Sequence, residues 1–146
     1  MSDMLNPEIK SGAVIKIFCE FTRPPKYKFL MIACIDPLLA FVINSDINDF
    51  IKNRPELLQD QVDIPASDHH FLVLDSVMNC VQVHQAIEIS SPITNNDLNN
   101  AYQGHIQHYC LREIIRVVDE SVNLNTIQKK LIINSINADN RLNEYY

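Results

Sequence analysis

The fold is decided by residues 12–33, which read GAVIKIFCEFTRPPKYKFLMIA. Residues 13–21 alternate between an apolar side and a partly wet side, as expected of a half-buried strand. Residues 29–35 are almost continuously apolar, which is typical of a central strand covered on both faces. The loop between them is stiffened by two prolines and carries Arg23, Lys26 and Lys28. An anionic ligand is therefore expected at this loop.

Further short apolar segments predict more strands, at residues 38–43, 61–64, 71–74 and 80–89. Residues 46–52 have helical spacing before Pro55, which favours a short helix or a turn there. Six short strands with tight joins are typical of a small antiparallel barrel. The sequence thus predicts a barrel of residues 8–90.

After Ser90-Ser91-Pro92 the pattern becomes helical. Thr94 is placed to cap a helix whose first turn contains Asp97. A stripe on one helical face follows, made of Ile106, Cys110, Ile114, Val117 and Val118. Residues 123–125 then interrupt the helical pattern and supply a cap for a last helix. Residues 94–146 are therefore expected to form a C-terminal helical extension packed on the barrel.

Composition narrows the function classes. The chain has 146 residues, of which 47% are hydrophobic, so it can bury a core as one domain. Its net charge of −6 gives no overall attraction for nucleic acid, and any such binding needs a local basic patch. The longest apolar run is far shorter than the ~20 residues of a membrane span. The first ten residues are polar, so we expect no export signal and a soluble, cytoplasmic protein.

The cysteines and histidines indicate neither disulfides nor a metal site. Four widely spaced cysteines lie in apolar surroundings and without a C-x-x-C pair, which favours free, buried thiols. His105 and His108 are three residues apart on a predicted helix, but Cys110 falls on another side of it. The spacings match no structural zinc pattern. We expect no metal and no cofactor.

Several short motifs coincide with those of one known family. They are Gly12 before the first strand, Phe18, then Phe21-Thr22 before the proline loop, Lys26 and Lys28 opening the second strand, Ser45, and Asp75-Ser76 before a later strand. Over about residues 8–90 the chain resembles the MazF/PemK/Kid toxins. The resemblance implies a small SH3-like barrel that dimerises, cleaves single-stranded RNA without a metal, and is neutralised by an antitoxin protein.

The same resemblance implies the roles of particular residues. Asp75 would take a proton as general base, and Lys28 would stabilise charge on the phosphate. Independently of the resemblance, His70, or its neighbour His69, would serve as acid, because histidine can donate a proton near neutral pH. Thr22, Arg23, Lys26 and Ser45 would bind RNA. The chain would be the toxin-like component of a bacterial toxin–antitoxin or defence module.

One departure keeps a second function open. The family has K-x-R-P where this chain has Lys26-Tyr27-Lys28-Phe29, and lysine lacks the planar fork with which arginine grips a phosphate. The alternative is a catalytically inactive SH3-like protein-interaction module. Plain structural roles also stay open: Asp75 as a turn residue, residues 68–70 as an exposed loop, and the basic loop as a solvated hairpin tip.

Overall fold

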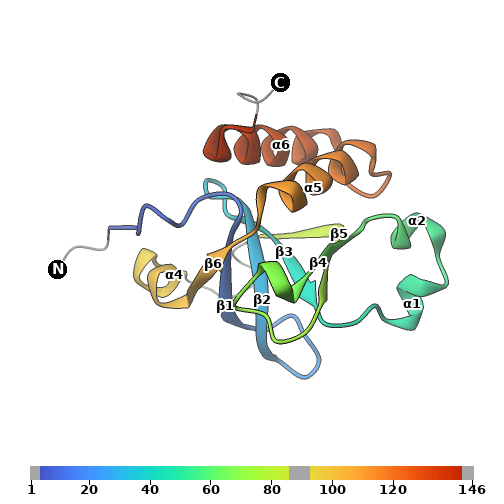
Figure 1. Ribbon diagram of the computed structural model, residues 1–146, viewed down its shortest axis with the longest axis horizontal. Coiled ribbons are helices and arrows are strands. Elements are labelled where there is room, and N and C mark those ends of the chain that lie inside the picture. Colours follow the sequence, from blue (N-terminus) through green and yellow to red (C-terminus); the bar gives the residue numbers. More distant parts are fainter. Residues whose placement is uncertain (1–3, 86–92, 143–146) are drawn as a thin grey trace.

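The computed structural model describes residues 4–85 and 93–142. Within these residues, six strands form one sheet in the order β4-β5-β3-β2-β1-β6, and every neighbouring pair is antiparallel. The sheet curls on itself (Figure 1). The strands are β1 (Ala13–Cys19), β2 (Lys26–Cys34), β3 (Leu39–Asn44), β4 (Gln61–Ile64), β5 (Ser76–Gln85) and β6 (Tyr102–His105).

The helices fall into two groups. The short α1 (Asp49–Lys52) and α2 (Pro55–Leu58) lie together between β3 and β4, and a 3-10 turn, η1 (Ala66–Asp68), follows β4. After the sheet come α4 (Asn95–Ala101), α5 (His108–Glu120) and α6 (Thr126–Asn140). Thr94 and Asn125 each form a capping box at the helix that follows, so both predicted helix starts are confirmed.

Each face of the sheet packs against a different part of the chain. Opposite residues of antiparallel strands share a face, so Val14 and Met31 lie together, and so do Ile15 and Leu30. The first face packs against α5 and α6. The second packs against α4 and residues near Ile9. The predicted central strand is confirmed, because β2 lies between β1 and β3 and is buried from its middle onward.

The predicted helical stripe is confirmed from Cys110 onward as the contact between α5 and the sheet, whereas Ile106 lies between β6 and α5. Ile106, Cys110, Ile114, Val117 and Val118 are all buried in one core cluster with strand residues. On the opposite side, Arg116 pairs with Glu113 and, at 2.6 Å, with Glu120. These pairs are exposed, so their contribution to stability is small. Burial of the stripe is what holds the helical layer.

Two segments differ from the sequence prediction. Residues 71–74 were expected to be a strand, but they form turns and bends, because Phe71 and Leu72 turn inward while Val73 and Leu74 remain exposed. Residues 102–105 were expected within a helical region, but they form β6, which pairs with β1. The C-terminal segment thus adds a strand to the sheet. The predicted strand 80–89 begins at Ser76, and its residues 86–89 lie outside the described part, as do Ser90 to Pro92.

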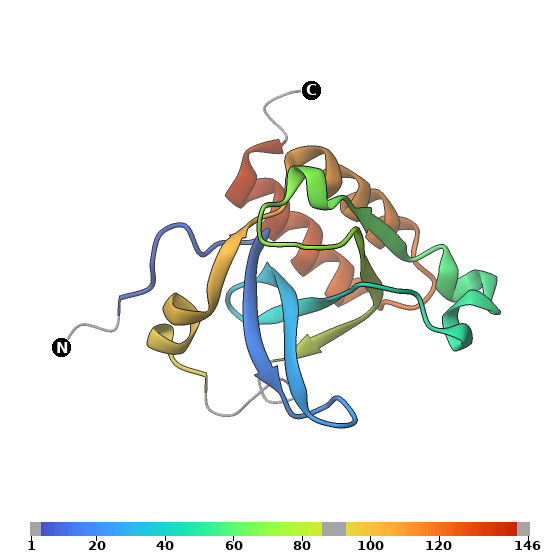
Figure 2. The same ribbon diagram turned by 60° about the horizontal axis from the view of Figure 1, so that its bottom comes forward.

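The fold class follows from these elements. It is a small, curled antiparallel sheet with C-terminal helices, as the sequence predicted. The loop joining β1 to β2 lies at the end of the sheet away from α5 and α6 (Figures 1 and 2). The predicted basic loop is therefore well separated from the helical layer.

The thiols provide a direct test of this packing. Cys19, Cys34, Cys80 and Cys110 are free and buried. Burial raises the pKa of the Cys19 thiol to about 11 and also raises the pKa values of Cys80 and Cys110. Because the thiolate is the reactive form, we expect little reaction of the native protein with a thiol reagent at neutral pH. In denaturant, all four thiols should react. Rapid labelling of native protein would contradict this packing.

Candidate functional site

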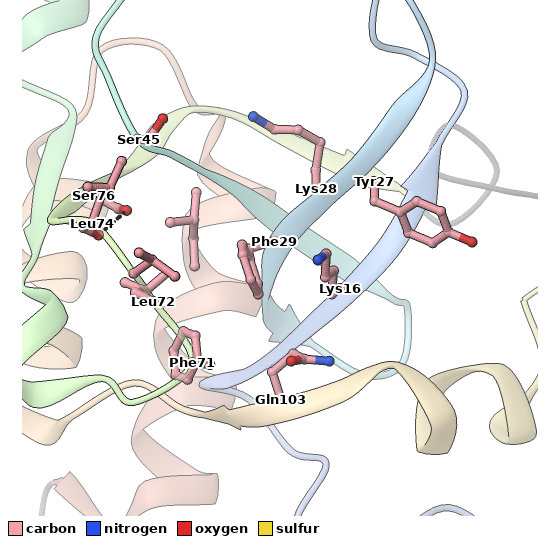
Figure 3. Close-up of a pocket in the computed structure, with 12 residues that line it drawn as sticks. Lys16, Tyr27, Lys28, Phe29, Ser45, Phe71, Leu72, Leu74, Ser76 and Gln103 are labelled. Atoms are coloured by element: carbon pink, nitrogen blue, oxygen red, sulfur yellow. Dashed lines mark hydrogen bonds between the residues drawn. The ribbon is translucent and has the colours of Figure 1, made fainter.

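A groove with a volume of about 430 Å³ lies beside the curled sheet (Figure 3). Its walls come from β1, β2, the end of β3 with Ser45, residues 71–74, Ser76 and β6. Two cations, three aromatic rings and one amide give it its chemical character. We call it the aromatic–lysine groove and define it by Lys16, Tyr27, Lys28, Phe29, Phe71 and Gln103.

Strand register brings a cation and an aromatic ring together in the groove. Lys16 of β1 lies directly opposite Phe29 of β2, so both side chains project from the same face. The Lys16 Nζ atom lies 5.5 Å from the centre of the Phe29 ring, within the range of a cation–π contact. Phe71 lies in the loop between η1 and β5, and its ring centre is 6.1 Å from that of Phe29. The floor is thus a pair of rings beside a cation.

Lys28 supplies a second cation at the edge of the groove. Its Nζ atom donates a hydrogen bond to Oδ1 of Asn44 at 2.7 Å, which fixes the position of the ammonium group. Burial lowers the pKa of Lys28, and the nearby charge of Lys26 lowers it further. Tyr27, between these two lysines in sequence, is 63% exposed and packs edge-on against Phe18. It offers an accessible ring on the groove wall.

The loop that carries Phe71 is held by two side chains from the sequence prediction. His69 is buried, and its Nε2 atom accepts a hydrogen bond from the backbone N–H of Gln107 at 3.1 Å. Because that N–H can only donate, Nδ1 carries the ring proton and donates to the Pro65 carbonyl at 2.7 Å. Asp75 Oδ1 accepts from the Ala66 N–H at 2.9 Å. Both side chains thus have structural partners.

The structure brings only some of the predicted site residues together. Lys28 and Ser45 line the groove, and Ser76 lies beside them. His70 is exposed and its ring packs edge-on against Phe71, with centres 5.7 Å apart. Asp75 does not line the groove; its carboxylate is engaged by the adjoining turn. Among the described residues that line the groove, none carries a carboxylate or an imidazole.

The remaining predicted residues lie on the β1–β2 hairpin. Thr22 Oγ1 accepts from the Lys26 N–H at 3.0 Å and lies 2.9 Å from the Pro24 carbonyl, so its hydroxyl closes the loop. Arg23 and Lys26 are exposed on that hairpin. None of these three residues lines the groove. Their roles in RNA binding stay predictions.

Sequence reasoning missed five functional candidates, namely Lys16, Tyr27, Phe29, Phe71 and Gln103. The alternation in β1 did place Lys16 on the wetter side, but only the register of β1 against β2 shows that it lies over Phe29. Gln103 was not predicted because it lies in a region of the sequence with a helical pattern. Phe71 carried no signal, since apolar residues in a short run are equally typical of a strand.

In residues 4–85 and 93–142, no group of three or more His, Cys, Asp or Glu side chains is placed to hold a metal ion. Within the same residues, no helix is long and apolar enough to cross a membrane. No protein-family model matches the chain, and no curated protein matches it.

Proposed function

We propose that the aromatic–lysine groove binds single-stranded RNA. The observation that carries this proposal is the placement of Lys16 over the Phe29 ring, with Phe71 on one side and the accessible Tyr27 on the other. Proteins bind single strands with rings on which bases stack and with cations that follow the phosphates. Lys16 and Lys28 provide such cations locally, although the whole chain has a charge of −6.

The biological setting follows from the family resemblance. We propose that the protein is the toxin-like component of a bacterial toxin–antitoxin or related defence module. An antitoxin protein and a second copy of the chain are then its expected protein partners. The groove supports this setting because it lies in the part of the chain, residues 8–90, that carries the resemblance, with Gln103 as the exception.

The groove favours binding over cleavage. The proposed base, Asp75, is engaged by the Ala66 N–H, and the proposed acid, His70, does not line the groove. Its alternative, His69, has both ring nitrogens bonded. Metal-independent endoribonuclease activity is the second candidate, and one observation favours it. The lowered pKa of Lys28 makes its ammonium group a better proton donor near neutral pH, as a leaving 5′-oxygen would require. A catalytically inactive interaction module remains the alternative to both.

A binding assay tests the proposal. Labelled single-stranded RNA is titrated with protein in chelator, and fluorescence anisotropy gives the affinity. Tyr27→Ala should weaken binding roughly tenfold, because a stacked base contributes about 1–3 kcal/mol. Tyr109→Ala is the matched control, since Tyr109 is also exposed but does not line the groove. Failure of the wild-type protein to bind, or equal binding by Tyr27→Ala, would contradict the proposal.

The same reactions report on cleavage when the RNA is run on a denaturing gel. Intact RNA is expected for a binding protein. If the RNA is shortened, Asp75→Asn identifies the base, because the amide keeps the shape of the side chain but cannot accept the proton. If RNA is bound but intact, Lys28→Arg tests whether the missing planar fork is the reason.

A further inference from the structure

Among the described residues after β5, Gln103 is the one that lines the groove. It lies in β6 between Tyr102, which pairs with Ile15, and Gly104, which pairs with Val14. Figure 3 shows its side chain on β6 near Phe71 and Lys16, and all three residues line the groove. The side chain is partly buried, so its amide occupies a defined place on the wall.

The orientation of this amide is fixed by one hydrogen bond. Nε2 lies 3.1 Å from the Ala101 carbonyl oxygen, to which it donates. Because a carbonyl oxygen can only accept, the nitrogen must face Ala101, and the Oε1 position is thereby determined. Among the described residues, none donates a hydrogen bond to Oε1. The amide therefore presents an acceptor and its second N–H to whatever enters the groove.

A glycine holds this amide next to an aromatic ring. A Cβ atom on Gly104 would lie 2.9 Å from Cδ1 of Phe71 and 3.2 Å from Cε1 of His70. The bare backbone at Gly104 lets Phe71 pack closely against β6, one residue from Gln103. A planar base placed against the Phe71 ring would thus have its edge near the Gln103 amide.

We propose that Gln103 is a specificity-determining residue that favours adenine in the bound strand. This inference rests on the proposed function. The N6 amino group of adenine donates and its N7 atom accepts, which matches the Oε1 acceptor and the remaining N–H of glutamine. Guanine presents two acceptors, N7 and O6, along the same edge, so one of them opposes Oε1. Pyrimidines offer a smaller ring for stacking on Phe71.

Four labelled octauridylates that differ only at one central base test this inference. The base is A, G, C or U, and binding is measured by anisotropy in chelator. The wild-type protein should bind the adenine-containing strand roughly tenfold more tightly than plain octauridylate, as one bidentate base contact provides. In Gln103→Leu the ratio between the affinities for the adenine-containing strand and for plain octauridylate should fall from roughly tenfold to about one. Gln59→Leu, an exposed glutamine outside the groove, should keep the preference.

Gln103→Met keeps the length of the side chain and serves as a second variant if leucine disturbs β6. Equal binding of all four strands by the wild-type protein would overturn the adenine inference and leave RNA binding in place. An adenine preference that survives in both variants would also overturn it. Absence of binding to every strand would overturn the proposed function together with the inference.

Discussion

Replacing Ile114 with aspartate is expected to lower the free energy of unfolding by about 4 kcal/mol, the cost typical of an unpaired charge in a protein core. Ile114 has no exposed surface and belongs to the core cluster shared by α5, α6 and the sheet. An aspartate there either stays charged without a partner or must be protonated. Urea denaturation followed by circular dichroism measures the loss as a lower midpoint.

Ile127 offers a matched control for that substitution. It is 72% exposed in the first turn of α6. Ile127→Asp makes the same chemical change, but it places a negative charge in water near a helix N-terminus, where it is tolerated or slightly favourable. Its free energy of unfolding should stay within about 0.5 kcal/mol of the wild-type value. Equal midpoints for Ile114→Asp and the wild-type protein would mean that α5 does not pack on the sheet.

Removing both groove lysines is expected to have the largest effect on RNA binding. Each lysine that contacts a phosphate releases counterions on binding, and for single strands the log–log salt slope changes by about 0.7 per contact. The variant Lys16→Ala/Lys28→Ala should therefore bind weakly and show a salt slope smaller in magnitude by about 1.4. Binding isotherms between low and moderate salt give this slope.

The paired change Lys52→Ala/Lys130→Ala removes the same charge from outside the groove. Lys52 lies in α1, where it is within 4.0 Å of Asp46, and Lys130 is exposed on α6. Its salt slope should equal that of the wild-type protein. An equal fall in slope for both pairs would show that RNA responds to net charge alone, and the groove would lose its role.

Much of the fold could be predicted because local patterns and packing agree. The alternation matches the second half of β1, where Lys16 and Phe18 are exposed, but Val14 on the same side is fully buried. The stripe containing Ile114 matches the buried face of α5. The start of α6 was predictable because an asparagine before a helix satisfies its first backbone N–H groups. In each case the local signal and the tertiary contact require the same residue types.

The two errors in the fold have a common physical cause. The apolar run 71–74 has strand-like composition, but its residues contact the core and line the groove without pairing as a strand. The hydrogen bonds of His69 and Asp75 hold the loop that contains them. The short segment 102–105, Tyr-Gln-Gly-His, has little strand character and becomes β6 because its backbone pairs with β1. Long-range contacts decide both segments, and a local pattern does not contain them.

The site was harder to predict because polar residues serve structure and chemistry equally well. Thr22 and Asp75 matched a family pattern, yet their oxygen atoms are used within the hairpin loop and the turn after β4. Lys28 and Ser45 do line the groove. Lys16 became a candidate only once the strand register placed it over an aromatic ring. Spacing along the chain cannot supply that register.

The most direct test of RNA binding in the aromatic–lysine groove is an NMR titration of the isotope-labelled protein with a short single-stranded RNA. If the groove is the binding site, the backbone amide resonances of Lys16, Tyr27, Phe71 and Gln103 should shift together and saturate with one affinity. Resonances of α6, on the helical layer, should stay unchanged. Shifts confined to the hairpin tip around Arg23, or no shifts at all, would contradict the account.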